Sequence, residues 1–293
     1  MSNQIDVVQL VRNGKAHYEW HWIISQVGNV WLRIAVLRDA MKFNGIPSLD
    51  WYRRPKNQAS TYAKLYDGVR LPASAEELQQ IADILGGMLL TPRVVDLIWL
   101  QAGLRFNANV NSGKPSYTIA AEMDVTTLHK LIETDIAAAG GDDGSKLISC
   151  VGKYWVLINQ LIGHPPVQGD VASCNYGWAS TGASGPGLTP GVKVWQRPGY
   201  RHNKRHLDPS QTIRLMHRRC ELSLDEGHTW ESASMLDIAA NPNLAPLIAW
   251  DKKVLSYLRQ DGVEEQPMGS HIVLPPVTIT AGGTPGPKAG ATS

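Results

Sequence analysis

The stretch SAEELQQIADILGGMLLTPRVVDLIWLQA, residues 74–102, decides the helical part of the fold. Ser74 and Glu77 form an S-x-x-E capping box, in which each side chain can pair with a free backbone N–H of the first turn. Apolar residues then follow at helical spacing, and a glycine pair supplies the C-cap. Thr91 is a good N-cap and Pro92 fits the first helical position, so a second helix is expected to begin at once. The two helices together predict a helical hairpin.

The pattern outside this stretch changes from helical to β-like along the chain. Upstream, residues 30–37 (VWLRIAVL) are rich in β-branched and aliphatic side chains and predict a mostly buried strand. Downstream, residues 125–139 have helical spacing and are followed by a glycine-rich loop. Short β-like runs separated by Gly, Pro and Ser then favour an antiparallel sheet or a small barrel. These runs cover residues 146–161, 171–178, 192–196 and 212–222.

The sequence therefore predicts an α+β protein with one domain over residues 1–262. Residues 1–144 are expected to be helix-rich and residues 145–262 β-rich. Within the second part, TGASGPGLTPG (residues 181–191) predicts a lid or a linker, and residues 235–258 are expected to return to helix. Residues 263–293 are Pro/Gly-rich and contain too few apolar residues to fold, so a flexible tail is expected.

Composition narrows the class of protein. The chain has 293 residues, of which 43% are hydrophobic, and a net charge of +2. So small a charge gives no support to nucleic acid or a membrane surface as partner. No apolar run approaches the roughly 18 residues of a membrane span, and the start lacks the pattern of a signal peptide. We expect a cytoplasmic protein, or one released without a signal peptide.

Three widely spaced cysteines, Cys150, Cys174 and Cys220, predict free thiols. Their odd number and spacing fit neither a disulfide framework nor a CxxC metal site.

The densest group of chemistry-bearing side chains lies in WQRPGYRHNKRHLDPSQ, residues 195–211. Proline and glycine predict a loop, and catalytic side chains concentrate on loops that a scaffold holds in place. Either His202 or His206 can act as a general base, with Asp208 as the group that orients it. Two histidines four residues apart can also share a metal on a helix, but the prolines and the glycine argue against a helix here. No metal or other cofactor is therefore expected.

Two nucleophiles accompany the histidines. Cys174 precedes them and gives the chain order Cys, His, Asp of papain-like and cell-wall amidohydrolase folds, although it lies in a β-like run. Ser210 lies close to them but lacks the GxSxG elbow that exposes such a serine. Both are candidate catalytic residues, and a packed thiol and a loop hydroxyl are the alternatives.

Aromatic side chains accompany the polar stretch. Tyr176 and Trp178 alternate in a strand-like run, so we expect both to project from one face of a sheet. With Trp155 and Trp195 they would form a wall beside the histidines and bind a glycan or a peptide-like substrate. The alternative is that the tryptophans pack in a small β core.

Three further polar side chains are candidates for substrate binding. Gln196 would position the substrate, and Arg201 or Arg214 would stabilise negative charge that develops on it.

Two resemblances accompany these residues. SQTIRL (residues 210–215), preceded by His202, resembles the SHGC[IV]R[LM] motif of L,D-transpeptidases. The nucleophilic cysteine of that family would fall on Thr212 or Ile213, so this resemblance implies a similar β topology without the catalytic group. Three segments also resemble an uncharacterised family of bacterial and phage-associated proteins, over roughly residues 1–262. This second resemblance implies a shared fold and no particular activity; its segments are residues 68–99, 152–159, and 175–178 together with 202–211.

The sequence favours a hydrolase or an acyl- or glycosyl-transferring enzyme that acts on a bacterial cell-wall or related glycopeptide substrate. In this interpretation a His–Asp pair performs the chemistry. The alternative is a non-catalytic carbohydrate-binding or phage structural module, and a metalloenzyme comes third.

Overall fold

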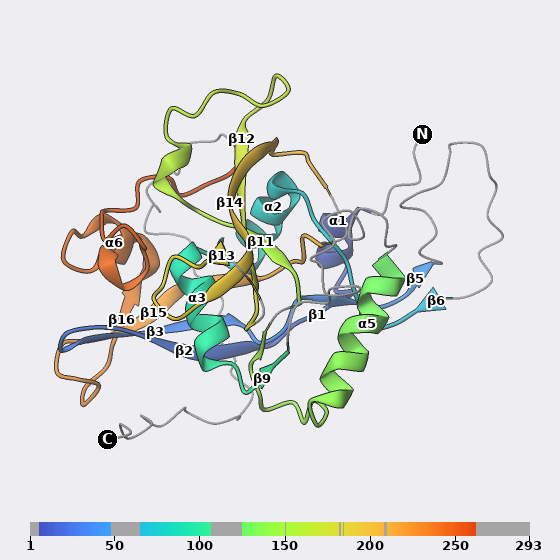
Figure 1. Cartoon of the computed structure of the whole chain (residues 1–293), viewed down its shortest axis with the longest axis horizontal. Helices are drawn as coiled ribbons and strands as arrows, with labels where there is room; N and C mark the ends of the chain where they lie inside the picture. The colour runs from blue at the N-terminus through green and yellow to red at the C-terminus, as the bar shows by residue number, and fades with distance from the viewer. Residues whose placement is uncertain are drawn as a thin grey trace.

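The computed structural model describes residues 6–47, 65–106, 125–149, 151–181, 183, 185–207 and 210–261. This part of the chain mixes helices with open sheets that are mostly antiparallel, and none of these sheets closes into a barrel (Figure 1). The predicted α+β class is therefore confirmed, with sheets rather than a small barrel. The expected tail, residues 263–293, lies outside the described residues.

The larger sheet joins the beginning of the chain to its later part. Its strand order is β16 (Glu231–Ser234), β15 (Leu215–Ser223), β3 (Val30–Leu37) and β2 (Trp20–Val27). The strand predicted at residues 30–37 is confirmed as β3, which pairs with β2 without a register shift. Because β3 also pairs with β15, the sheet combines the segment expected to be helix-rich with the segment expected to be β-rich.

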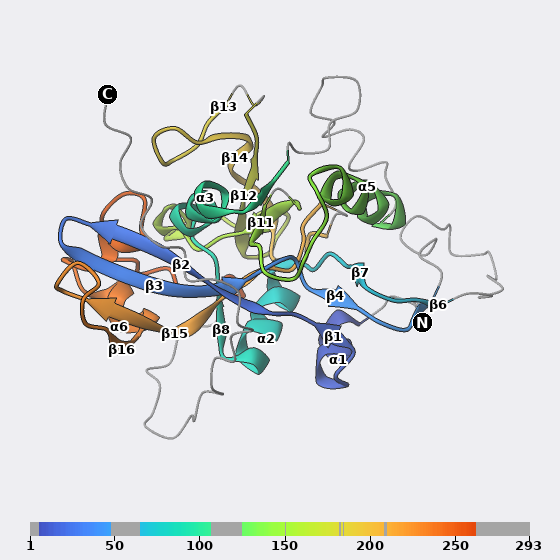
Figure 2. The ribbon, with the colours of Figure 1, turned by 90° about the horizontal axis from the view of Figure 1, so that it is seen from below.

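Both helices of the stretch at residues 74–102 are confirmed, as α2 (Ala75–Leu85) and α3 (Pro92–Gln101). The capping box is complete: the N–H of Glu77 donates to Ser74 Oγ, and the N–H of Ser74 donates to Glu77 Oε2. Between the helices, however, the buried strand β8 (Gly87–Leu89) pairs with β15. Figure 2 shows α2 and α3 on opposite sides of the larger sheet. The expected hairpin is therefore split, because its apolar connection pairs with a sheet edge.

The third predicted helix is confirmed as α5 (Val125–Ala138), which buries Leu128, Ile132 and Ile136. The expected helix over residues 235–258 forms only as α6 (Met235–Ala240) and the 3-10 turn η4 (Ala245–Leu247). Pro242 lies just beyond α6, and a proline disfavours helical backbone at the residue before it. A further short helix, α1 (Val7–Arg12), begins the described chain.

The smaller sheet carries the candidate site. Its strand order is β11 (Lys153–Trp155), β12 (Ala172–Ala179), β14 (Lys193–Asn203) and β13 (Gly185–Pro186). The prediction of a loop over residues 195–211 is wrong as far as Asn203, because β14 continues to that residue. The register between β12 and β14 shifts twice, and these irregularities accommodate Pro198 and Gly199 in the strand.

Helix α3 lies between the two sheets. On one side Gln101 exchanges hydrogen bonds with the backbone of Ile24 in β2, and on the other side α3 packs against β12. The remaining elements are short: β1 (Ala16–His17), β4 (Lys42–Phe43), β5 (Ile46–Pro47), β6 (Leu65–Tyr66), β7 (Val69–Arg70), β9 (Leu104–Arg105), β10 (Ile148–Ser149) and the 3-10 turn η3 (Asn159–Leu161).

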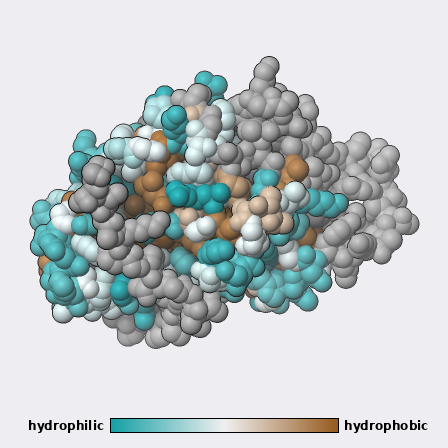
Figure 3. Space-filling view, turned by 60° about the horizontal axis from the view of Figure 1, so that its bottom comes forward, coloured by the Kyte–Doolittle hydropathy of each residue, from teal (hydrophilic) through white to brown (hydrophobic). Residues whose placement is uncertain are grey.

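One buried core runs through these elements, while the face in Figure 3 shows hydrophilic residues beside smaller apolar areas. In the described part of the chain, no helix is both long and apolar enough to cross a membrane. Cys174 and Cys220 are buried free thiols, and Cys150 lies outside the described residues.

Candidate functional site

The two histidines of the polar stretch lie directly on each other. The imidazole rings of His202 and His206 stack with their centroids 3.7 Å apart and their planes 14° apart. Both rings stand edge-on to the indole of Trp155, at 6.2 and 6.4 Å between centroids. Both histidines are half-buried. The structure therefore brings together two of the predicted catalytic residues, and both pack against the indole ring of Trp155.

A tight turn after β14 produces this stack. The N–H of His206 donates to the carbonyl of Asn203 at 3.1 Å, and the N–H of Arg205 donates to Asn203 Oδ1 at 3.0 Å. Asparagine is favoured in such turns because its side chain can accept from a backbone N–H two residues on. The chain consequently bends back and places His206 over His202.

The indole ring of Trp155, against which the histidines pack, is held rigidly. Its side chain is fully buried, and its indole N–H donates to the carbonyl of Ala73 at 2.9 Å. A buried tryptophan whose N–H is paired has little freedom to move.

Two buried polar side chains share the face of the sheet that carries Trp155. Asn175 pairs with Trp155 across β11 and β12, and Ser173 pairs with His202 across β12 and β14. Directly paired residues project to the same face. Ser173 and Asn175 are 0% and 1% exposed, and within the described part of the chain neither the hydroxyl nor the amide forms a hydrogen bond. Buried polar groups normally have a partner, so this pair indicates a site that a ligand or a water completes.

The segment that follows the histidines in the chain, at Ser210, packs beside β11. The N–H of Lys153 donates to the carbonyl of Ser210, which is fully buried beside β11. A Cβ on Gly152 would lie 2.6 Å from that carbonyl oxygen and 2.8 Å from Thr212 Oγ1. Only glycine therefore permits so close an approach. Sequence reasoning missed this role of Gly152, and its position inside the β-like run over residues 146–161 was the available signal.

Gln196 lies next to Asn175, at the irregular part of β14. A Cβ on Gly199 would lie 2.7 Å from Asn175 Oδ1 and 2.8 Å from Gln196 Nε2, so the two side chains meet at this glycine. Gln196 Nε2 donates to the carbonyl of Arg197 at 2.7 Å. The prediction that Gln196 lies near the histidine site fits this arrangement. Arg201 is exposed on β14.

Asp208 lies outside the described residues. Its pairing with His202 or His206 therefore stays a prediction.

The predicted aromatic wall is wrong, because its members lie on different faces of the sheet. Tyr176 pairs with Tyr154 and so faces away from Trp155. Its hydroxyl donates to Asp96 Oδ1 at 2.7 Å, in the interior between β12 and α3. Trp178 is 5% exposed and has a positive φ of 55°, which interrupts the regular alternation of the strand.

Asp96 forms a second buried polar group that sequence reasoning did not find. Its other oxygen accepts from the N–H of Thr189 at 2.8 Å, while the N–H of Leu188 donates to Tyr176 Oη at 3.0 Å. Burial raises the pKa of Asp96 to about 6, against the opposing effect of the hydrogen bonds from Tyr176 and Thr189. These bonds attach part of the predicted lid or linker to α3 and β12.

The surroundings of Cys174 give no support to a nucleophilic role. The thiol is fully buried, and its Sγ lies 3.7 Å from the carbonyl oxygen of Asn175. Burial raises the pKa of Cys174 well above its usual value, which disfavours the reactive thiolate. Catalysis by Cys174 stays a prediction.

Arg214 is a structural cross-link rather than an exposed cation. Its guanidinium is fully buried and donates to three backbone carbonyls, those of Leu37, Ile148 and Arg38, at 2.8 to 2.9 Å. These carbonyls occupy the donors that the predicted role in charge stabilisation would use.

No group of three or more His, Cys, Asp or Glu side chains among the described residues is placed to hold a metal ion. The chain matches no protein-family model, no curated protein and no solved structure. The fold and the site describe an α+β protein with a histidine pair beside two buried polar side chains, Ser173 and Asn175. The resemblances to L,D-transpeptidases and to the uncharacterised bacterial family stay predictions.

Proposed function

We propose that this protein is a hydrolase or an acyl- or glycosyl-transferring enzyme for a bacterial cell-wall or related glycopeptide substrate. The observation that carries the proposal is the His202–His206 stack beside the buried side chains of Ser173 and Asn175, which have no hydrogen-bond partner among the described residues. An imidazole is the usual general acid and base near neutral pH, and buried hydrogen-bonding groups are suited to a polarised substrate.

Each group has a role in this proposal. One imidazole accepts the proton of the attacking water or substrate hydroxyl and returns it to the leaving group. The amide N–H of Asn175 donates to the oxygen on which negative charge develops, in the manner of an oxyanion hole. Asp208 orients the histidine, as the sequence predicts, and Gln196 positions the substrate. The glycopeptide substrate class rests on the sequence pattern.

Replacement of the histidines tests the proposal. His202→Gln and His206→Gln, assayed on purified peptidoglycan and on model esters, are expected to lower kcat by at least about a hundredfold, the usual contribution of a general acid or base. His228 is exposed on a loop far along the chain, so His228→Gln is the matched control and should keep full activity. Full activity in both stack variants would refute the proposal.

The alternative is a non-catalytic carbohydrate-binding or phage structural module. The burial of Ser173, Asn175 and Ser210 favours it, because a closed polar layer also suits a protein without turnover. In that case the wild-type protein binds saccharide and shows no turnover, and the two glutamine variants bind as the wild type does.

A further inference from the structure

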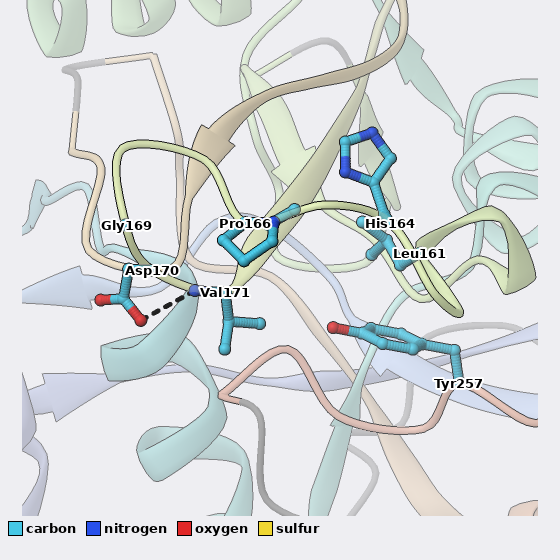
Figure 4. Close-up of a pocket in the computed structure, with 8 residues that line it drawn as sticks. Leu161, His164, Pro166, Gly169, Asp170, Val171 and Tyr257 are labelled. Carbon is cyan, nitrogen blue, oxygen red and sulfur yellow. Dashed lines mark hydrogen bonds between the residues drawn. The ribbon is translucent and has the colours of Figure 1, made fainter.

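A second concave site lies beside the beginning of β12. A pocket of about 380 Å³ opens between the loop at residues 161–172 and Tyr257. Figure 4 shows Leu161, Pro166, Val171 and Tyr257 around it. This volume is at the small end of the range for ligand sites, about 300–1,000 Å³, and fits one ring rather than an extended molecule.

Most of the pocket wall is apolar. Leu161 is buried and therefore fixed, while Pro166 and Val171 extend the apolar surface toward the loop. The phenol ring of Tyr257 adds an aromatic surface opposite them (Figure 4). A wall of this kind suits the nonpolar face of a ring, and tyrosine combines such a face with a polar end.

The Tyr257 hydroxyl is available to a ligand. In Figure 4 it points toward Val171, across the opening below Pro166. Within the described part of the chain, the side chain of Tyr257 forms no hydrogen bond, whereas its backbone N–H donates to Asn159 Oδ1. The phenol group is half-buried, so its hydroxyl can donate to or accept from a ligand hydroxyl.

His164 lies at the edge of the pocket, and in Figure 4 its imidazole points away from the Tyr257 hydroxyl and Val171. Its Nδ1 lies 2.9 Å from the carbonyl oxygen of Pro165, an acceptor, so Nδ1 carries the proton. The ring is held in place because it stacks on Tyr200 with centroids 5.6 Å apart.

The charges at the pocket are compensated. Asp170 Oδ1 accepts from the N–H of Val171 at 2.8 Å, and Asp170 Oδ2 pairs with Arg205 Nε at 3.2 Å. The described lining contains neither lysine nor arginine. The pocket therefore favours an uncharged ligand over an anion or a cation.

We propose that this pocket binds one ring of a neutral saccharide. The apolar wall would contact the nonpolar face of the sugar, and the Tyr257 hydroxyl would pair with one sugar hydroxyl. The inference goes beyond the proposed function, since saccharide binding here does not require the histidine stack to be catalytic.

Binding of neutral trisaccharides to the full chain tests this proposal. Cellotriose and chitotriose are titrated by calorimetry and observed by saturation-transfer NMR, with the dipeptide N-acetyl-Ala-Ala as a comparison. We expect at least one trisaccharide to bind and the dipeptide not to compete. Tyr257→Phe keeps the ring and removes only the hydroxyl, so it should weaken binding about five- to tenfold, the effect of one hydrogen bond.

Two controls test whether the effect of Tyr257→Phe is specific to this pocket. Tyr18→Phe removes a hydroxyl from a tyrosine that is 40% exposed elsewhere, and it should bind as the wild type does. His228→Gln changes an exposed loop residue and should also keep full affinity. Failure of both trisaccharides to bind, unchanged affinity in Tyr257→Phe, or displacement of the sugar by the dipeptide would each overturn the proposal.

Discussion

Both faces of β12 bury polar side chains, but the two faces differ in whether these side chains have hydrogen-bond partners. On the face toward α3, the hydroxyl of Tyr176 and both oxygens of Asp96 have hydrogen-bond partners. On the face toward Trp155, the side chains of Ser173 and Asn175 are equally buried and have no partner within the described part of the chain. A buried polar group with partners holds segments together, whereas one without partners costs stability and is retained where a ligand uses it. The partners, rather than burial, distinguish the two faces.

The largest expected effect concerns the pH dependence of the paired face. The pKa of Asp96 is raised to about 6, above its ordinary value of 3.8, so the folded state holds this proton more tightly than the unfolded state. Its contribution to the free energy of unfolding is full below pH 4 and is lost as pH rises through 6. A shift of about two pKa units corresponds to about 3 kcal/mol.

The measurement compares urea unfolding of the wild type and Asp96→Asn between pH 4 and pH 7. The wild type should lose up to about 3 kcal/mol relative to the variant over this interval. A difference that stays constant with pH would contradict the raised pKa.

The second expected effect concerns the close contact between the backbone at Gly152 and the backbone at Ser210, next to the face that carries Ser173 and Asn175. Gly152→Ala places a Cβ 2.6 Å from the carbonyl oxygen of Ser210, where backbone must move. We expect a loss of about 2 kcal/mol in the free energy of unfolding, within the usual cost of overpacking. Gly103→Ala is the matched control, because the atoms nearest to its Cβ would be Cβ and Cγ of Lys146 at 3.2 Å, a longer contact that involves no backbone atom. Equal losses in the two variants would show that close approach at Gly152 has no special role.

The third prediction removes one hydroxyl from the paired face. Tyr176→Phe leaves Asp96 Oδ1 and the N–H of Leu188 without their partner, so we expect a loss of about 1–3 kcal/mol in chemical denaturation. The ring remains and packing is conserved. Stability equal to that of the wild type would mean that the hydrogen bonds of the Tyr176 hydroxyl do not stabilise the fold.

The smallest effect is expected for the corresponding change on the other face. Ser173→Ala also removes one buried hydroxyl, but that hydroxyl has no partner within the described chain. Stability should therefore stay within about 0.5 kcal/mol of the wild type or rise slightly. A loss of stability as large as that of Tyr176→Phe would remove the distinction between the two faces.

Local chemistry explains why some elements could be predicted from the sequence. The capping box of Ser74 and Glu77 and the Thr91-Pro92 start define helix ends through neighbours within four residues, and both are confirmed. The apolar run of β3 is likewise a local signal. The candidate site was predicted in part: the two histidines do lie together, because Asn203 folds the turn between them.

The wrong predictions share a cause in long-range pairing. Pro198 and Gly199 indicate a loop locally, but bulges opposite β12 allow β14 to continue through them. Tyr176 was expected beside Trp155, yet the register of β11 and β12 places the two rings on opposite faces. A one-residue change of register exchanges the faces of a strand, and sequence periodicity does not fix it.

By itself, the sequence determined where the principal helices begin and where polar, chemistry-bearing side chains gather, because capping and turn formation act over a few residues. Only the tertiary structure decided that His202 and His206 stack on each other against Trp155, and that Cys174 and Arg214 are enclosed in the interior. It also decided that Ser173 and Asn175 lie beside the histidines without a hydrogen-bond partner among the described residues. The reason is physical: which face a side chain occupies, and whether it finds a partner there, depends on strand register and on segments far away in the chain.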